Sequence, residues 1–236
     1  MANRVKITRL DEIELARVGM LPREQKKQAL RRGKSGHPPY YLNAVRAHFM
    51  DILGVPISEF LPMSRVAWTK IRASIRKACR HSTAERIANV QLGRGLYLFV
   101  DEHDVKGRPA DFAPLSLGLS GDALTYWCRA ILEIDGHPYV AFIDPRQSHG
   151  VTRKSLRFVF SMMHTAIREG RGDLAAVRFV VIKFGPTVKG ARKVRLLFEP
   201  DDIELIDHKT LSADVRETYQ VWEQVLQERA AKKRAA

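Results

Sequence analysis

The chain has 236 residues, 45% of them hydrophobic, and carries a formal net charge of +14 with a pI near 10.1. This length and composition are sufficient for a sizeable core and are typical of one large domain or two small ones. The sequence has no apolar run long enough to cross a bilayer and no secretory signal at its start, so we expect a cytoplasmic protein. Its two cysteines, Cys79 and Cys128, are far apart and lack metal-site spacing, which argues against a structural zinc site and a disulfide framework. We expect neither a metal nor another cofactor.

The excess of positive charge favours a polyanionic partner. A strongly basic surface attracts phosphates and releases counterions when it meets them. A nucleic acid, or a protein that handles one, is therefore the leading class of partner, and a membrane is not expected. A basic surface that only keeps the protein in solution explains the bulk charge equally well. The distribution of the charges carries more information than their sum.

The first 63 residues are predicted to form a basic helical arm and a linker. Pro22 suits a first helical turn and Gly33 a helix C-cap, so the segment between them should form a short basic helix. Asn43 is the predicted cap of a second helix, which continues to Leu53 and is ended by Gly54. Phosphate contacts from the first helix would not depend on base sequence. The candidate residues for these contacts are Arg23, Lys26, Lys27, Arg31 and Arg32.

The next helix, predicted to start at Ser64, has one buried stripe and one cationic face. Apolar residues recur at helical spacing, with Ile71 and Ile75 at the centre of the stripe. Arg72 and Arg76 fall outside the stripe and are further candidates for nucleic-acid binding.

Residues 81–104 are open to three interpretations: a core helix, a docking peptide or the edge of an active site. The stretch Ser82-Thr83-Ala84-Glu85 matches the reciprocal capping box, and apolar residues then recur every fourth position. We therefore predict a helix over about Thr83–Asp104. Gly95 costs roughly 1 kcal/mol inside a helix, so its presence predicts the close approach of another element.

From residue 106 the pattern changes to β structure, with a hairpin at Asp135-Gly136. A very apolar helix that starts at Thr152 and stops at Gly170 should be central, and Ser212 should cap a last helix. The order ββαβββα behind the first helices predicts an α+β fold, in which a basic helical N-terminal arm precedes a mixed sheet packed on central and C-terminal helices. Residues 64–236 should form this second domain. The predicted strands are Leu124–Ile134, Pro138–Ile143, Val177–Phe184, Lys193–Phe198 and Ile203–Ile206.

Carboxylates in this region suggest a restriction-type nuclease, whose core holds a metal ion between acidic residues and uses a lysine to position water. The candidate catalytic residues are Glu133, Asp144, Lys183, Asp207 and Lys209. The spacing does not match this core, because Arg146 stands where the motif needs a lysine and Asp207 lies directly before the final helix. A turn ahead of Pro145 explains Asp144 without catalysis. The sequence leans toward a protein that is not an enzyme.

Four stretches of the chain resemble a family of small alphaproteobacterial proteins, the SocB replication-inhibitor toxins of type VI toxin–antitoxin systems. These stretches are His37–Tyr41 with Val45-Arg46, Arg94–Tyr97, Phe142–Arg146 and Arg157–His164. The resemblance covers about residues 20–230. It implies a non-enzymatic toxin that binds the DNA polymerase sliding clamp and stalls replication, while an antitoxin acts as a proteolytic adaptor that delivers the toxin to ClpXP. The alternative is a basic nucleic-acid-binding protein, including a divergent restriction-type nuclease.

A clamp-binding toxin should carry a docking peptide that binds in extended form, with glutamine, leucine and phenylalanine at fixed spacing. No stretch of the chain fits this pattern cleanly. One candidate lies in the predicted helix and would have to be released from it, and the other lies between Pro56 and Pro62, which favour an extended backbone. The candidate residues are Gln91, Leu98 and Phe99 in the first segment and Ile57, Phe60 and Leu61 in the second.

The end of the chain offers a degradation signal. The apolar stripe of the last helix stops at Leu226, so residues 229–236 should fray into solvent. Ala235-Ala236 then resembles the Ala-Ala ending that the ClpX unfoldase recognises on tagged proteins. A solvated basic tail that happens to end in alanine is the simpler interpretation.

Overall fold

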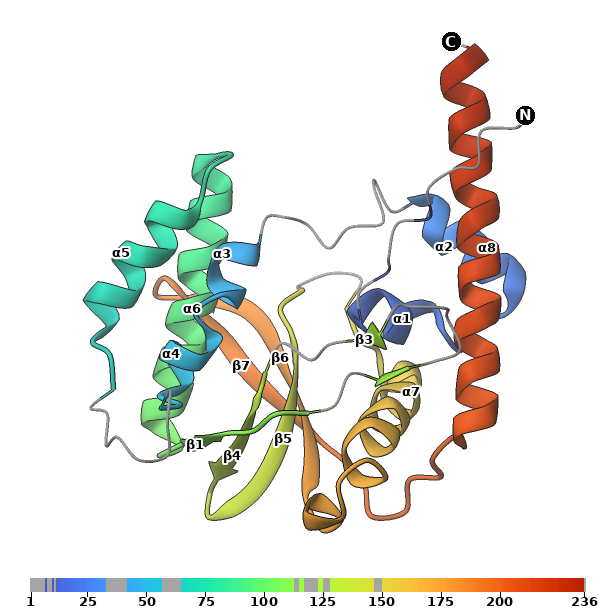
Figure 1. Ribbon diagram of the computed structural model, residues 1–236. Coiled ribbons are helices and arrows are strands. Elements are labelled where there is room, and N and C mark those ends of the chain that lie inside the picture. Colours follow the sequence, from blue (N-terminus) through green and yellow to red (C-terminus); the bar gives the residue numbers. More distant parts are fainter. Residues whose placement is uncertain are drawn as a thin grey trace.

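The computed structural model describes residues 7, 10, 12–32, 42–56, 65–112, 115–116, 123–124, 128–146 and 150–235. Its centre is a five-stranded sheet in the order β1-β4-β5-β6-β7, with helices on both faces (Figure 1). The strands are β1 (Lys106–Pro109), β4 (Ala130–Ile134), β5 (His137–Asp144), β6 (Arg178–Val188) and β7 (Ala191–Phe198). Only β5 and β6 pair in parallel, so the sheet is mixed and the predicted α+β class is confirmed. A separate short pair joins β2 (Leu115–Ser116) to β3 (Ala123–Leu124).

Two tight turns organise the hairpins of the sheet. Asp135 and Gly136 have positive φ angles of 51° and 79°, which confirms the predicted turn between β4 and β5. Lys189 and Gly190, with φ angles of 48° and 76°, form a similar turn between β6 and β7. These last two strands are therefore longer than the sequence analysis predicted.

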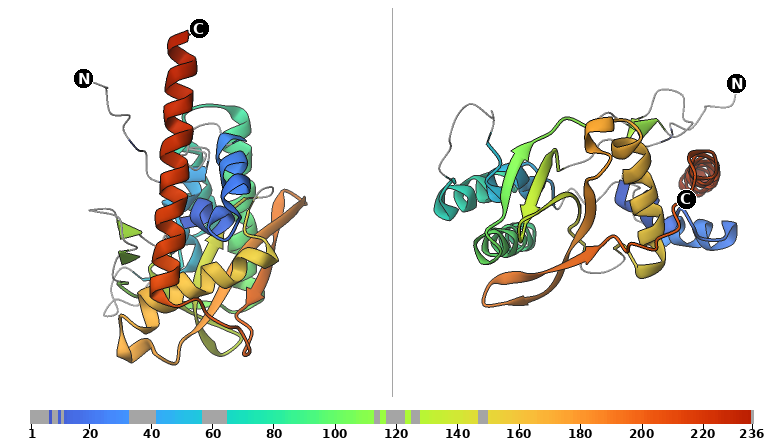
Figure 2. Two further views of the ribbon diagram at one scale, coloured as in Figure 1. Left: turned by 90° about the vertical axis from the view of Figure 1, so that its right-hand side faces the viewer. Right: turned by 90° about the horizontal axis from the view of Figure 1, so that it is seen from below.

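Helix α7 (Arg153–Met163) lies on one face of the sheet, and α1 (Glu12–Val18) and α8 (His208–Ala235) pack on α7 and share its core. Because β5 and β6 are parallel, the chain between them must cross over the sheet, and α7 makes most of this crossover. A capping box between Thr152 and Ser155 starts α7 at the predicted position. A π-helical turn, His164–Arg168, continues α7, and the whole element ends before Gly170. Helix α2 (Arg23–Arg32) packs on α8 rather than on the sheet (Figure 2).

The helices α3 (Asn43–Arg46), α4 (Phe49–Leu53), α5 (Trp68–Ala78) and α6 (Thr83–Glu102) lie on the other face. The predicted capping box of Ser82 and Glu85 is present at the start of α6. A Cβ atom at Gly95 would collide with the carbonyl oxygen of Arg192 in β7, which confirms the predicted close approach. Alternate residues of the central strands belong to different cores: Val181 packs with α7 and α8, and Ile182 packs with α6. The sheet is thus buried on both faces.

Several predicted elements differ in detail from the structure. The predicted helix from Asn43 to Leu53 is two short helices, because His48 leaves the helical region with φ −111° and ψ 12°; Gly54 ends the second one at φ 67°, as predicted. The predicted strand Ile203–Ile206 is irregular, and the amide of Ile206 donates to Ser161 Oγ instead of to a strand.

Helix α5 begins at Trp68, later than predicted, and α8 begins at His208 rather than after Ser212. Asp207 accepts a hydrogen bond from the Thr210 amide at 3.0 Å, so this residue caps α8. Helix α8 also continues to Ala235, which contradicts the expected fraying after Arg229. Alanine, lysine and arginine are strong helix formers, and they extend the helix beyond its apolar stripe.

Buried residues from the first 63 positions belong to the same two cores as the sheet. Leu15 of α1 and Leu30 of α2 lie in the core with α7 and α8, and Val45 and Phe49 lie in the core with α6. The division of the chain into two domains at residue 63 stays a prediction. Both cysteines are free and buried. Within the described residues, no helix is long and apolar enough to cross a membrane.

Candidate functional sites

Asp144 and Lys183 are the two residues of the proposed nuclease set that the structure brings together. They are register partners at the parallel ends of β5 and β6. Asp144 is fully buried and accepts hydrogen bonds from the Val151 amide at 2.6 Å and the Arg146 amide at 3.2 Å. Lys183 donates to the Val151 carbonyl. Burial raises the pKa of Asp144 above its usual value, although those amides and the nearby Lys183 and Arg146 act in the opposite direction. The pair fastens the segment that leads from β5 into α7.

The other three members of the nuclease set lie elsewhere. Glu133 pairs with Pro138 at the opposite end of β5, and the six residues from there to Asp144 span about 20 Å of strand. Asp207 caps α8. Its carboxylate accepts hydrogen bonds from the amide and the hydroxyl of Thr210, and these bonds lower the pKa of Asp207. Lys209 is exposed on the first turn of α8. In the part of the chain that the structure describes, no three His, Cys, Asp or Glu side chains are grouped so that they could hold a metal ion.

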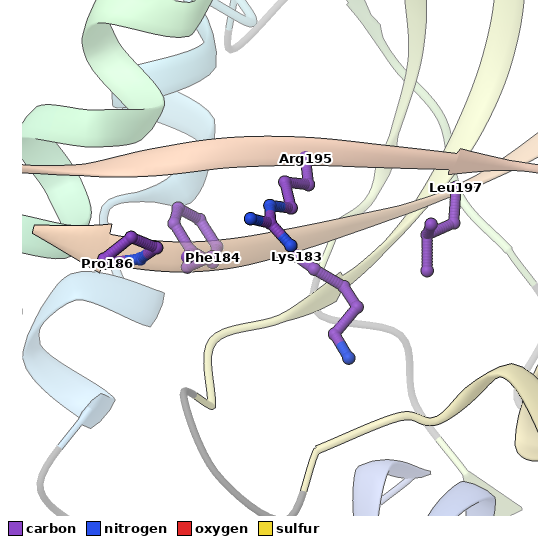
Figure 3. A pocket seen from close by; sticks show the side chains of 6 residues that line it. Lys183, Phe184, Pro186, Arg195 and Leu197 are labelled. Atoms are coloured by element: carbon purple, nitrogen blue, oxygen red, sulfur yellow. The ribbon is translucent and has the colours of Figure 1, made fainter.

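A groove of about 520 Å³ lies on the β6–β7 hairpin, next to Lys183 (Figure 3). Lys183 and Arg195 are cross-strand partners that line it, together with Phe184, Gly185, Pro186 and Leu197. Its described lining residues include no carboxylate. The groove is therefore cationic, and its chemistry suits an anion better than a metal ion.

The first candidate docking segment, Gln91–Phe99, is part of α6 and not extended. Leu92 and Leu96 are fully buried and Phe99 is 4% exposed, so release of this segment would break the core. Gln91 and Leu98 differ from Phe99, because they point away from the core. Leu98 is 39% exposed and lines a second groove, of about 330 Å³, beside β7.

The second candidate, with Ile57, Phe60 and Leu61, lies outside the described residues. The chain on both sides of it is anchored. Val55 is 5% exposed and packs on Gly107. Arg65 donates to the carbonyl oxygens of Tyr97 and Ile52 and pairs with Asp101. The Arg65 side chain also lies 3.6 Å from the position of a Cβ atom at Gly54, so the two anchors are neighbours in space.

The basic residues of α2 face acidic residues of α8. Lys26 is only 1% exposed, and its Nζ lies 2.5 Å from Glu217 Oε2. Glu228 pairs with Arg31 at 2.7 Å and with Lys27 at 3.0 Å, and hydrogen bonds from these two residues lower the pKa of Glu228. Arg23 reaches Glu217 at 3.8 Å, and Arg32 is exposed. Arg229 of α8 adds hydrogen bonds to the last carbonyl oxygens of α2. Four of the five basic side chains of α2 thus contact one of two carboxylates of α8.

The basic residues of α5 have a different environment. Arg72 and Arg76 are exposed, as are Lys70 and Lys77 on the same helix. Among the described residues, no carboxylate forms an ion pair with any of the four. Helix α5 therefore presents four exposed cations that no described carboxylate pairs with, whereas on α2 four of the five cations contact α8 carboxylates.

Comparison with known proteins identifies the family. Residues 13–232 match the family model described as sliding clamp-binding bacterial toxin SocB. The chain belongs to the SocB family. It is 30% identical over 225 residues to the DNA replication inhibitor toxin SocB of Caulobacter vibrioides, a match that covers 95% of this chain and 93% of that protein. No solved structure matches the chain. The resemblance found in the sequence is confirmed.

The proposed degradation signal lies at the far end of α8 in this member of the SocB family. Ala235 is the last residue of the helix, and Ala236 lies outside the described residues. The signal stays a prediction. It would belong to a helical end and not to a frayed tail.

Sequence reasoning missed the acidic partners of α2. Glu217 and Glu228 are eleven residues apart, which is about three helical turns, so they lie on one face of α8. This spacing in a predicted helix, together with a short basic helix elsewhere, was the available signal. A separation of 191 residues between Lys26 and Glu217 hides the pairing from any local pattern.

Proposed function

We propose that this chain is a toxin that inhibits DNA replication by binding the DNA polymerase sliding clamp. The observation that carries the proposal is the family match over residues 13–232, together with the near full-length similarity to a replication inhibitor toxin. The family is described by its binding to the sliding clamp, and the relative by its inhibition of DNA replication. We place the protein in the cytoplasm, where a toxin that acts on replication must work.

The docking segment is Ile57–Leu61 in this proposal. A clamp-docking peptide binds in extended form, and Gln91–Phe99 cannot become extended without breaking the core around Phe99. The flanks of Ile57–Leu61 are anchored at Val55 and Arg65, so a peptide between them is held in place at both ends, which lowers the ordering cost of binding.

Three alanine substitutions test this assignment by pull-down on purified sliding clamp. Phe60→Ala should abolish clamp binding and leave the melting temperature within a few degrees of the parent. Leu98→Ala is the matched control, because it removes an exposed apolar side chain of the competing segment and should change neither quantity. Phe99→Ala should instead lower stability by about 3 kcal/mol, as expected of a buried phenylalanine. Clamp binding that survives Phe60→Ala but fails in folded Leu98→Ala would move the site to α6.

The proposal includes control by proteolysis, in which an antitoxin acts as adaptor and presents the chain to ClpXP. Two surfaces can serve this role: the C-terminal Ala235-Ala236 and a region of the folded domain that the adaptor would hold. Changing both alanines to aspartate separates the two. A longer half-life in cells would assign the signal to the C-terminus, and an unchanged half-life would assign it to the adaptor-bound surface.

A second function, nucleic-acid binding that extends to nuclease activity, is favoured by the exposed cations of α5 and by the adjacent Asp144 and Lys183. Asp144→Asn tests the nuclease part, since asparagine keeps an acceptor for the Val151 amide. A folded variant that retains toxicity supports the clamp mechanism. Loss of toxicity with intact clamp binding would favour the nuclease.

A further inference from the structure

The exposed side of α5 and the residues just after it form a continuous cationic face. Its members are Lys70, Arg72, Arg76, Lys77 and Arg80. All of these residues are exposed, and none has a carboxylate partner among the described residues. The sequence from Arg65 to Ala84 contains no acidic residue, and the next one, Glu85, is buried in the capping box of α6. The positive charge of this face is therefore available to a ligand.

The opposite side of α5 holds the helix firmly in place. Ile71 and Ile75 are buried in the core shared with α6, and the Trp68 ring contacts Tyr97 at 5.5 Å between centroids. Between the cations, the exposed positions Thr69 and Ala73 carry small side chains. A helix face with long basic side chains around small ones can approach a charged surface closely.

The dimensions of the cationic face fit a nucleic-acid duplex. From Lys70 to Arg80 the chain covers about 15 Å if helical rise is assumed throughout. Duplex DNA carries one negative charge per about 1.7 Å, so several phosphates lie within this reach. B-DNA also has a major groove wide enough for a helix, whereas the deep, narrow groove of duplex RNA excludes one.

We propose that the cationic face of α5 binds the phosphate backbone of duplex DNA. The contacts are to phosphates and so do not depend on base sequence. The inference rests on the second function proposed above and names its ligand; the site is separate from the docking segment, and it needs no clamp. Helix α2, whose cations are held by α8 at the other end of the molecule, takes no part in it (Figure 1).

Fluorescence anisotropy of a labelled 20-base-pair DNA duplex, titrated with the purified full-length chain, tests the proposal. If four or five cations each neutralise one phosphate, affinity should fall about 150- to 500-fold between 50 and 200 mM salt. The test variant is Arg72→Gln/Arg76→Gln/Lys77→Gln. The matched control is Arg23→Gln/Arg31→Gln/Arg32→Gln, which removes the same charge from α2. Thermal unfolding confirms that each variant is folded.

The α5 variant should lose about ten-fold or more in affinity at 100 mM salt, and its logarithmic salt slope should fall by about three. The α2 control should stay within about two-fold of the parent. Equal losses in the two variants, or no loss in either, would overturn the proposal. So would tighter binding to duplex RNA than to duplex DNA, or equal competition by polyglutamate, which would indicate an acidic protein partner. A clamp pull-down of the α5 variant separates this test from the proposed function: lost clamp binding with unchanged DNA affinity would place α5 in the clamp interface instead.

Discussion

Helices α2 and α5 are alike in sequence, because each gathers basic residues in about ten positions, but the fold uses them differently. The cations of α2 lie against Glu217 and Glu228 of α8, and Lys26 is buried there. The cations of α5 point into solvent, while its apolar stripe packs on α6. A basic segment indicates a binding surface only when the rest of the chain leaves its charge unpaired.

The largest effect should come from breaking the buried pair of α2. Glu217→Gln leaves Lys26 buried without its closest carboxylate and should lower the free energy of unfolding by about 3 kcal/mol. The double variant Lys26→Met/Glu217→Gln replaces the pair by neutral groups and should recover most of this loss. Urea unfolding measures both. Arg72→Gln is the control on α5 and should stay within about 0.5 kcal/mol of the parent. A Glu217→Gln variant as stable as the parent would mean that the α2 cations are not structural.

Helix α5 packs on α6, and the packing of α6 on β7 should be sensitive to substitution of Gly95. Gly95→Ala forces a methyl group against the Arg192 carbonyl and should lower stability by about 2 kcal/mol, because backbone cannot yield as a flexible side chain can. Gly172→Ala is the matched control, since nothing lies within 4 Å of its new methyl group. Thermal unfolding of the two variants compares them. Equal melting temperatures would show that α6 can move away from β7 at little cost.

The ion pairs of Glu14 in α1 with Arg17 and Arg146 should make the stability of the fold depend on pH. Glu14 receives hydrogen bonds from Arg17 and Arg146; burial opposes its ionisation, but the two arginines outweigh burial and hold the pKa of Glu14 below its usual 4.5. The folded state therefore binds fewer protons here than the unfolded state. The stability from this carboxylate is present above pH 4.5 and is lost as the pH falls through the lowered pKa.

Glu14→Gln should therefore cost about 2 kcal/mol at pH 7 and less at lower pH, where the parent also loses its charge at this position. Urea unfolding at several pH values measures the difference. A cost that does not change with pH would show that Glu14 is not ionised against the arginines.

The smallest effect should come from the exposed pair of α2 and α8. A double-mutant cycle on Arg31 and Glu228 should give a coupling energy of about 0.5 kcal/mol, because both side chains are more than a third exposed and water screens them. The coupling should shrink further in 1 M salt. A coupling energy above about 2 kcal/mol would show that burial does not explain why the pair of Lys26 and Glu217 is expected to contribute more than the pair of Arg31 and Glu228.

Local signals predicted the parts of the fold that depend on neighbouring residues. The capping box at Ser82, the turn at Asp135-Gly136 and the close approach at Gly95 are all visible in short stretches. The strand predicted at Ile203–Ile206 is wrong because its apolar residues pack from an irregular segment, where Ser161 takes the amide of Ile206. Apolar content alone could not distinguish a strand from an irregular buried segment.

The candidate sites show the same division between local and distant information. The exposed cations of α5 follow from helical periodicity around Ile71 and Ile75. The pairing of the α2 cations with α8 carboxylates involves residues about 190 positions away, so no short stretch of the sequence reveals it. Asp144 and Lys183 meet through a parallel pairing across α7, which the order of elements suggested but could not assign to individual residues.

The most direct test measures the affinity of the purified chain for the sliding clamp, both free in solution and loaded on closed circular duplex DNA. The account predicts saturable binding to the free clamp that Phe60→Ala abolishes. It predicts binding to the loaded clamp that is tighter by about ten-fold or more, because two linked contacts reinforce each other. Arg72→Gln/Arg76→Gln/Lys77→Gln should remove only this gain. Failure to bind the free clamp would contradict the account, and equal affinity for the two forms would contradict the role of α5.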